Sequence, residues 1–397
     1  MSVRSENKEW GRRASPSYVK VRDWLLDYIA ERRLGPGDRV PSERVLAESL
    51  SLSRPTIARA ILELVEQKVL TREQGNGTFV ASPSARRLSE ATGSVGMLIP
   101  FSKHDPSGEA PDPDERLLGE NVSDQTIHGV LSVLKDSGCR LVVHHTSSAQ
   151  EEADVLASIA NEGLHGAIVL SLATPEMAKS YAKLVYTGPP IVFVDRYFPS
   201  VPIDRVVTDN VGGAREGVKH LISRGRRRIA YFTNFAEVTS IVDREAGYRA
   251  AIEEAGLACD EDIICGPEIA RYGRLSFEHS LHYCLSLPEP IDAVFCLNDD
   301  MVWAAIHAAH KLGLSIPQEL EVSGFFDSST PKSILGPVTR VVQAKFRIGQ
   351  IAAQLLLERM RGDGSAEPRH ILVSPDLIPA MPEEPFAVRE PAPAGRR

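Results

Sequence analysis

A short run near the N-terminus combines side chains that can read the edges of DNA bases. Ser53, Arg54, Pro55 and Thr56 stand together directly before an amphipathic stretch. Serine is favourable just before a helix, and proline is tolerated in the first turn, where its missing N–H costs nothing. An arginine in that turn can donate two hydrogen bonds to guanine in a major groove. The run therefore predicts a DNA-reading helix that starts after Ser53, with Arg59 one turn further along.

A hairpin is predicted after this helix. Strand-like runs at 69–73 and 78–81 flank the tip Gln74-Gly75-Asn76-Gly77. Glycine accepts the positive φ of a hairpin tip, and its backbone can approach a groove or a phosphate closely. We therefore expect Asn76 and Gly77 to contact DNA. The alternative is a head that binds a protein, with its arginines merely solvated.

A second set of candidate residues lies far along the chain, where each follows an apolar run. Asp195 and Arg196 follow PIVFV, Asn298 follows AVFCL, Asp327 follows SGFF, and Gln343 follows TRVV. Parallel sheets bind ligands in the crevice at the carboxyl ends of their strands. Converging carboxylates, amides and an arginine suit a polyhydroxylated ligand, because each hydroxyl can donate and accept. The alternative is that these residues are only helix N-caps.

Three helices are needed to position the DNA-reading residues. The first is predicted to start at Ser15-Pro16, and its apolar residues recur with the spacing of one helix face. The second runs from Ser42 to Leu50, and the third begins after Ser53. The residues expected to face inward are Val21, Trp24, Leu25, Tyr28, Ile29, Val45, Leu46, Leu50, Ile57, Ile61, Leu64 and Val65.

From Ser94 onward, short apolar strands alternate with amphipathic helices. The predicted strands are 95–100, 140–145, 166–171, 190–195, 229–233, 292–296 and 321–326. The predicted helices are 122–137, 149–161, 209–224, 243–256, 275–286, 299–313 and 344–362. Continuous apolar strands separated by helices indicate parallel sheets covered on both faces. A stretch this long exceeds one ordinary core, so we expect an α/β, doubly wound body with two lobes.

The predicted organisation is a winged helix-turn-helix domain at 1–82, a linker at 83–93, a two-lobed domain at 94–382 and a disordered tail at 383–397. Residues 1–87 carry a net charge of +5, and the rest of the chain carries −13. A basic head on an acidic body indicates that only the head meets phosphates.

Composition limits the remaining possibilities. The chain has no apolar run near the roughly 20 residues of a membrane span and no secretory signal pattern, so a cytoplasmic protein without a membrane partner is expected. The five cysteines are scattered and form no CxxC pair, which favours reduced packing residues over a metal site. No nucleophile–base pair emerges either. We therefore expect no catalytic residues, no metal and no cofactor.

The phrases PSERVLAESL, SRPTIARAI and GNGTFV make the head resemble the GntR-type winged helix over about residues 17–82. This resemblance implies DNA contacts from Arg44, from the SRPT run, and from the wing around Gly75 and Gly77. That family usually has arginine at the position of Ala58. We expect the next residue, Arg59, to compensate for it.

The body resembles the effector domain of LacI/GalR-type repressors, which is related to periplasmic sugar-binding proteins. The matching phrases include VVTDNVGGAREGVKHLISRGRRRIAYFT, DREAGYRAAIEEAG and PIDAVFCLNDDMVWAAIHAAHKLGLSIPQELEVSGF. The resemblance implies effector contacts from Asp195, Arg196, Arg244, Asn298 and Gln343, and a homodimer formed through the effector domains. The layout as a whole is similar to that of arabinose-responsive repressors.

One position departs from this pattern. Family members usually have two aspartates after the glycine and aromatic residue, whereas this chain has Phe326 followed by Asp327. We expect Phe326 to present an aromatic face to the effector, which would stack on a sugar ring or select a less polar ligand.

These observations predict a transcriptional regulator that binds double-stranded operator DNA and a small sugar-like effector. Repression relieved by the effector is the expected mode. The alternatives are an activator or corepressor-type regulator with a non-sugar effector, an enzyme of the kind in which GntR-type heads join aminotransferase-like bodies, and a ligand carrier.

Overall fold

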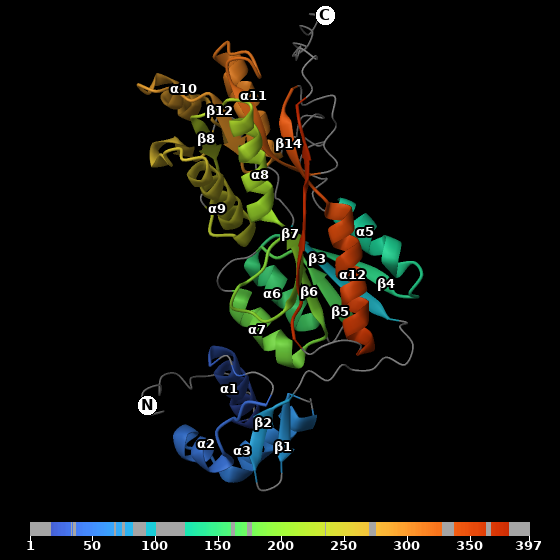
Figure 1. The fold of residues 1–397 in the computed structure, drawn as a ribbon. Helices are drawn as coiled ribbons and strands as arrows, with labels where there is room; N and C mark the ends of the chain where they lie inside the picture. Colours follow the sequence, from blue (N-terminus) through green and yellow to red (C-terminus); the bar gives the residue numbers. More distant parts are fainter. Residues whose placement is uncertain are drawn as a thin grey trace, which may run out of the picture.

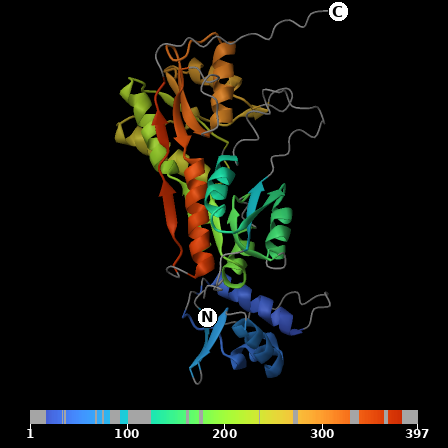
Figure 2. The ribbon, with the colours of Figure 1, turned by 90° about the vertical axis from the view of Figure 1, so that its right-hand side faces the viewer.

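The computed structural model describes residues 17–32, 34, 37–66, 69–73, 76–81, 93–100, 124–159, 163–172, 177–234, 236–269, 275–327, 337–362 and 367–380. The predicted tail and most of the predicted linker lie outside these residues. The described chain forms a small head and a body of two lobes, which are stacked in Figures 1 and 2 with the head next to the first lobe. No helix among these residues is long and apolar enough to cross a membrane.

The head has three helices and a two-stranded hairpin. They are α1 (Ser17–Glu31), α2 (Glu43–Leu50), α3 (Arg54–Glu66), β1 (Leu70–Glu73) and β2 (Gly77–Val80). The apolar stripes of α1 and α3 pack against each other, and Leu46 is the buried residue of α2. The prediction that Val45 faces inward was wrong, because Val45 is 37% exposed and the short α2 buries only a narrow stripe.

The first lobe, here called the N-lobe, contains a parallel sheet of six strands. Its strand order is β15-β7-β6-β5-β3-β4. The strands are β3 (Ser94–Pro100), β4 (Arg140–Thr146), β5 (Leu164–Val169), β6 (Ile191–Val194), β7 (Asp204–Thr208) and β15 (His370–Val373). The helices are α5 (Asp124–Leu134), α6 (Ala149–Ser158), α7 (Met177–Thr187) and α12 (Lys345–Arg361). The central strands β3, β5 and β6 are almost wholly buried, as expected for a sheet covered on both faces.

The second lobe, here called the C-lobe, has a six-stranded sheet in the order β16-β14-β13-β12-β8-β9. The strands are β8 (Ile229–Phe232), β9 (Ile264–Cys265), β12 (Ala293–Cys296), β13 (Glu321–Asp327), β14 (Thr339–Gln343) and β16 (Asp376–Ile378). The helical elements are α8 (Asn210–Ser223), α9 (Thr239–Glu254), η1 (Glu261–Ile263), α10 (Glu278–Ser286) and α11 (Asp299–Lys311). A small hairpin, β10 (Glu268–Ile269) and β11 (Leu275–Ser276), completes the lobe.

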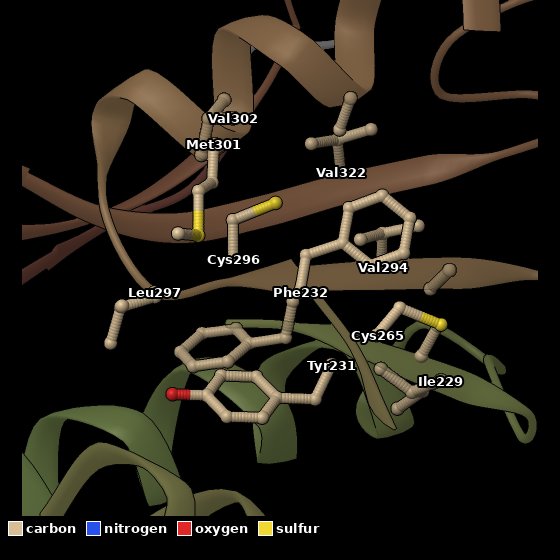
Figure 3. Packing of buried hydrophobic residues seen from close by; sticks show 14 of the residues in the cluster. Ile229, Tyr231, Phe232, Cys265, Val294, Cys296, Leu297, Met301, Val302 and Val322 are labelled. Atoms are coloured by element: carbon tan, nitrogen blue, oxygen red, sulfur yellow. The ribbon is translucent and has the colours of Figure 1, made fainter. Parts of the chain in front are cut away.

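Side chains from the two faces of the C-lobe sheet enter separate layers. In Figure 3, Met301 and Val302 of α11 lie on one side of the strands, and Tyr231 lies on the other. Tyr231 stacks on Tyr248 of α9, with ring centroids 5.1 Å apart. Phe232, the next residue along β8, stacks on Phe277 at 4.1 Å. This alternation decides which layer of the C-lobe core each side chain enters.

The two-lobed α/β fold was predicted correctly, but several elements were not. Helix α7 was missed, as were β7, β9, β15 and β16 and the small hairpin. Strand β16 also pairs antiparallel to β14, so the C-lobe sheet is not wholly parallel as expected. These strands have two to five residues each. They are too short for their apolar pattern to distinguish them from loops.

The chain passes between the lobes three times. The crossings lie at 208–210, 343–345 and 373–376, and the last is the red segment that runs along both lobes in Figure 1. They are hydrogen-bonded to one another: Thr208 Oγ1 donates to Gln343 Oε1 at 2.9 Å, and Asp209 N donates to Val373 O at 2.9 Å. The carboxyl ends of β6 and β13, from different lobes, meet beside these crossings.

Helices α5 and α12 touch at two glycines. A Cβ atom at Gly129 would lie 2.0 Å from the carbonyl oxygen of Phe346, and one at Gly349 would lie 2.1 Å from that of Thr126. Both obstacles are backbone atoms of the opposite helix. The two helices can therefore keep this distance only while both positions lack a side chain.

We expect Gly349→Ala to destabilise the protein by about 1–3 kcal/mol, because α5 and α12 must move apart to admit the methyl group. Thermal unfolding monitored by circular dichroism measures the change. Arg347→Ala, at an exposed position of the same helix, is the control. Equal melting temperatures for the two variants would contradict the close helix contact.

Candidate functional site

The start of α3 has the geometry predicted for a DNA-reading helix. Ser53 precedes the helix, its Oγ accepts a hydrogen bond from Thr56 N at 3.4 Å, and it lies 2.8 Å from Thr56 Oγ1. The turn before it contains Ser51 at φ 54°, which closes α2. The helix start is therefore fixed by its own cap. Arg54 and Pro55 are exposed in its first turn, where they are accessible to a groove.

Two other arginines that were predicted to contact DNA differ in how their side chains are held. Arg44 is exposed on α2. The Arg59 guanidinium lies over the ring of Tyr18 in α1, with its carbon 4.1 Å from the ring centroid. A cation held against an aromatic face loses part of its conformational freedom. Arg59 therefore also links α3 to α1.

The hairpin forms the predicted wing. Asn76 is exposed, and its backbone and side-chain nitrogens donate to Glu73 O at 3.0 Å and Glu73 Oε2 at 2.6 Å. Gly77 has φ +135°, and a Cβ there would meet the Arg39 guanidinium at 2.8 Å. Sequence reasoning missed Arg39, although this exposed cation lies beside the wing tip. Gly75 lies outside the described residues.

Four charged residues from both lobes meet at the crossings and are here called the junction cluster: Asp195, Arg244, Asp327 and Lys345. Lys345 Nζ lies 2.6 Å from Asp195 Oδ1, which follows N-lobe strand β6, and 3.8 Å from Asp327 Oδ1 at the end of C-lobe strand β13. The Lys345 side chain is 4% exposed. Its ammonium group is therefore shared between carboxylates of the two lobes. No pattern in the sequence indicated this role for Lys345.

Arg244 of α9 is held by groups of the C-lobe. Its Nε donates to Asn210 Oδ1 at 2.8 Å, and its Nη1 donates to the Leu297 carbonyl at 2.6 Å. Its guanidinium carbon lies 4.0 Å from the centroid of the Phe325 ring. The arginine that was expected only from the family resemblance is thus buried at the junction, next to the strand end that leads to Asn298.

The other predicted effector residues surround this cluster. Gln343 Nε2 donates to Asp327 Oδ1 at 3.1 Å, and Arg196 Nε lies 3.4 Å from Asp195 Oδ2. Asn298 caps α11, where its Oδ1 accepts from Met301 N at 3.0 Å. Its amide nitrogen is not used by this cap. Asp195 has φ 65°, an uncommon conformation for a residue other than glycine, and one that clusters at binding sites.

Phe326 is not placed with these residues. It is 1% exposed and belongs to the C-lobe core. Alternation along β13 puts it on the same face as Gly324, which is next to Val302 of α11, and opposite to Phe325 and Asp327. Phe325, which sequence reasoning did not select, is the aromatic residue in contact with Arg244.

The electrostatics of the junction follow from burial and the shared lysine. Burial alone would raise the pKa of Asp195, but the charges of Lys345 and Arg196, with the hydrogen bond from Lys345, hold it well below its usual range. Burial raises the pKa of Asp327 to about 6, because the more distant Lys345 opposes this only in part while Asp299 and Asp195 add to it. One carboxylate is thus firmly ionised, and the other titrates close to neutral pH.

The raised pKa of Asp327 predicts a pH-dependent stability difference. The folded chain binds this proton more tightly than the unfolded chain, so the resulting stability is complete below about pH 4 and lost as the pH rises through about 6. Asp327→Asn removes the titration and keeps an acceptor for Gln343. Between about pH 4.5 and 7.5, the variant should gain about 2 kcal/mol relative to the wild type. Urea unfolding of both proteins measures this, and a constant difference would contradict it.

Two further polar groups adjoin Arg244. Tyr231 and Thr233 are fully buried at the carboxyl end of β8. The Tyr231 hydroxyl is close to Thr233 and Arg244, and burial raises its pKa. Apart from their contact with each other, neither hydroxyl has a hydrogen-bond partner among the residues the structure describes. Buried hydroxyls in this state are available to a ligand.

The basic run 224–228 has intramolecular partners. Arg224 and Arg226 both pair with the buried Glu321, at 2.5 Å and 2.9 Å. Arg228 pairs with Asp260 at 2.5 Å. These pairs show that the arginines of this run stabilise the C-lobe.

Comparison with protein families identifies both parts of the chain. Residues 17–80 match the model of the bacterial regulatory proteins of the gntR family, and residues 218–379 match a periplasmic binding protein-like domain. The arabinose metabolism transcriptional repressor of Geobacillus stearothermophilus is 23% identical, over 91% of this chain and 96% of the relative. The HTH-type transcriptional regulator CelR of Thermobifida fusca is 25% identical, over 86% of this chain and 97% of the relative.

Solved structures agree on the fold. The complex of the transcriptional regulator CelR with cellobiose superposes with a TM-score of 0.62 at 24% identity, and covers 90% of this chain and 98% of that structure. A regulatory protein of the LacI family from Chloroflexus aggregans superposes with a TM-score of 0.60 over 72% of this chain and 97% of that structure.

Proposed function

The chain joins a GntR-type DNA-binding head to a periplasmic-binding-protein-like body and is a ligand-responsive transcriptional regulator; we propose that it is a repressor that leaves its operator when a small sugar-like effector binds between its two lobes. The observation that carries this proposal is the junction cluster. Its carboxylates come from different lobes, so a ligand held there contacts both. Relatives named for arabinose metabolism and for a cellobiose complex support a sugar as effector.

The mechanism follows from the crossings. The effector is enclosed between the carboxyl ends of β6 and β13, and it changes the angle between the lobes about the three crossing segments. A ligand shifts such an equilibrium only by its difference in affinity for the two arrangements. Carboxylates that face each other across the lobes provide this difference, because their hydrogen bonds to one ligand form together only when the lobes are closed.

The regulator acts as a homodimer in this proposal. Two-fold operators require two reading helices about one DNA turn apart, so a small rotation of the bodies misplaces one of the heads. Exposed apolar side chains on the N-lobe support a partner surface there. Leu131 of α5 is 43% exposed, and Val143 of the edge strand β4 is 38% exposed. Size-exclusion chromatography with light scattering tests the dimer.

The full proposal is tested with the purified chain and its own upstream DNA. A gel-shift titration at moderate salt should show specific retardation, and a thermal-shift screen of sugars should identify compounds that raise the melting temperature. Those compounds should then release the DNA. No retardation would overturn the proposal, and tighter binding with the compound would instead show a corepressor or activator.

A further inference from the structure

The junction cluster contains both of the cations that are buried in the described part of the chain, Lys345 and Arg244, which are 3% and 6% exposed. They stand beside Asp195 and Asp327, so two positive groups face two carboxylates. Burying a charge without a partner costs several kcal/mol, whereas a paired set is tolerated. The charges of these four buried groups therefore balance before any ligand arrives, and the more exposed Arg196 lies outside this set.

The ammonium group of Lys345 can donate more hydrogen bonds than this pairing uses. An ammonium group has three N–H donors, and within the described residues one of them is hydrogen-bonded, to Asp195 at 2.6 Å. At 3.8 Å, Asp327 is an ion-pair partner outside hydrogen-bond distance. A hydroxyl oxygen is the acceptor that can take a remaining donor without adding charge. The same hydroxyl can donate to the carboxylates on either side.

We propose, building on the proposed effector site, that the effector is an uncharged polyhydroxylated molecule and that the charge balance to which Lys345 contributes sets this preference. Its ammonium group neutralises carboxylates of both lobes and donates to an effector hydroxyl. A sugar acid or sugar phosphate adds a negative charge for which the cluster has no unmatched buried cation. An amino sugar meets Lys345 and Arg244 with a charge of their own sign.

The first test compares matched ligands in thermal-shift titrations of the full chain. The probes are L-arabinose, D-ribose, D-glucose and cellobiose, each with its aldonate, and D-glucosamine. We expect stabilisation by at least one neutral sugar, and binding at least about 100-fold weaker for its aldonate. Stabilisation by an aldonate at equal or lower concentration, or by no neutral sugar, would overturn the proposal.

Two variants then move the charge of the site in opposite directions. Asp195→Asn leaves Lys345 without its nearest carboxylate, so discrimination against the aldonate should fall by about tenfold or more. Lys345→Met leaves Asp195 and Asp327 with Arg244 as their one buried counter-ion, so the affinity for glucosamine should rise relative to that for glucose. The control is Lys219→Met at an exposed position of α8. Unchanged discrimination in Asp195→Asn would also overturn the proposal.

A double variant and a parallel measurement of operator binding serve as controls. The double variant Asp195→Asn/Lys345→Met removes a matched pair, so it should retain the preference for neutral sugars even if Lys345→Met alone fails to fold. A reversed preference in the double variant would show that the charge balance does not set the preference. Operator binding without sugar is measured in parallel, because loss of retardation in the wild type concerns the proposed function and not the charge of the effector.

Discussion

Arg244→Met is expected to abolish the response to effector and to destabilise the protein by about 3 kcal/mol. The guanidinium holds Asn210 and the Leu297 carbonyl and lies on Phe325. Without it, these polar groups lose their donor, and Asp195 and Asp327 are left with Lys345 as their buried counter-ion. Thermal unfolding with and without the sugar that stabilises the wild type measures both effects.

The head should be unaffected by this change. Arg244 belongs to the C-lobe, so Arg244→Met should still retard operator DNA at temperatures below its melting point, but added sugar should no longer release the DNA. Arg244→Lys keeps the charge and loses the second donor arm, and we expect an intermediate response. If the Arg244→Met variant released the operator DNA at the same sugar concentration as the wild type, Arg244 would not contact the effector.

Arg54→Ala is expected to weaken specific operator binding by about 1–3 kcal/mol, roughly 5- to 150-fold, with no change in melting temperature. The side chain is exposed in the first turn of α3, so its removal leaves the head core intact. A base-reading arginine gives a loss that depends on sequence. Gel shifts with operator and unrelated DNA at two salt concentrations separate that loss from a phosphate contact.

Arg227→Ala is the matched control for Arg54→Ala. It removes the same charge from an exposed position of the C-lobe, where Arg227 donates to backbone carbonyls of Ile222 and Arg226. Operator affinity should stay within about twofold of the wild type, as expected for a surface change away from the DNA. An equal loss in both variants would mean that total charge governs binding, and the assignment of α3 as the reading helix would fail.

The head could be predicted from sequence because its signals are local. The serine cap and the proline act together in the first turn of α3, and the wing glycine acts within its own hairpin, so each signal can be recognised from neighbouring residues. Arg39 was missed for the opposite reason. It comes near Gly77 only after the chain has passed through α2, α3 and β1, and no short-range pattern records that approach.

The junction cluster could be predicted only in part. Asp195, Asp327 and Gln343 follow strands, and the rule for carboxyl ends of parallel strands selected them. Lys345 begins a helix and looks like an ordinary exposed lysine, yet it pairs with a carboxylate 150 positions away. Phe326 was selected because it occupies the place of a family aspartate, and the sequence does not tell which face of β13 meets Arg244. That choice depends on packing against α8 and α11.

The three crossings also set the order in which a newly made chain acquires structure. The N-lobe sheet needs β15, which ends at Val373, and the C-lobe sheet needs β16, which ends at Ile378, so both lobes stay incomplete until the last part of the chain has been synthesised. The head is continuous in sequence and ends near Ala81. At about 5–20 residues per second, the remaining chain takes roughly 15–60 s to emerge from the ribosome. For that interval the head is complete, whereas the body cannot yet enclose a ligand between its lobes.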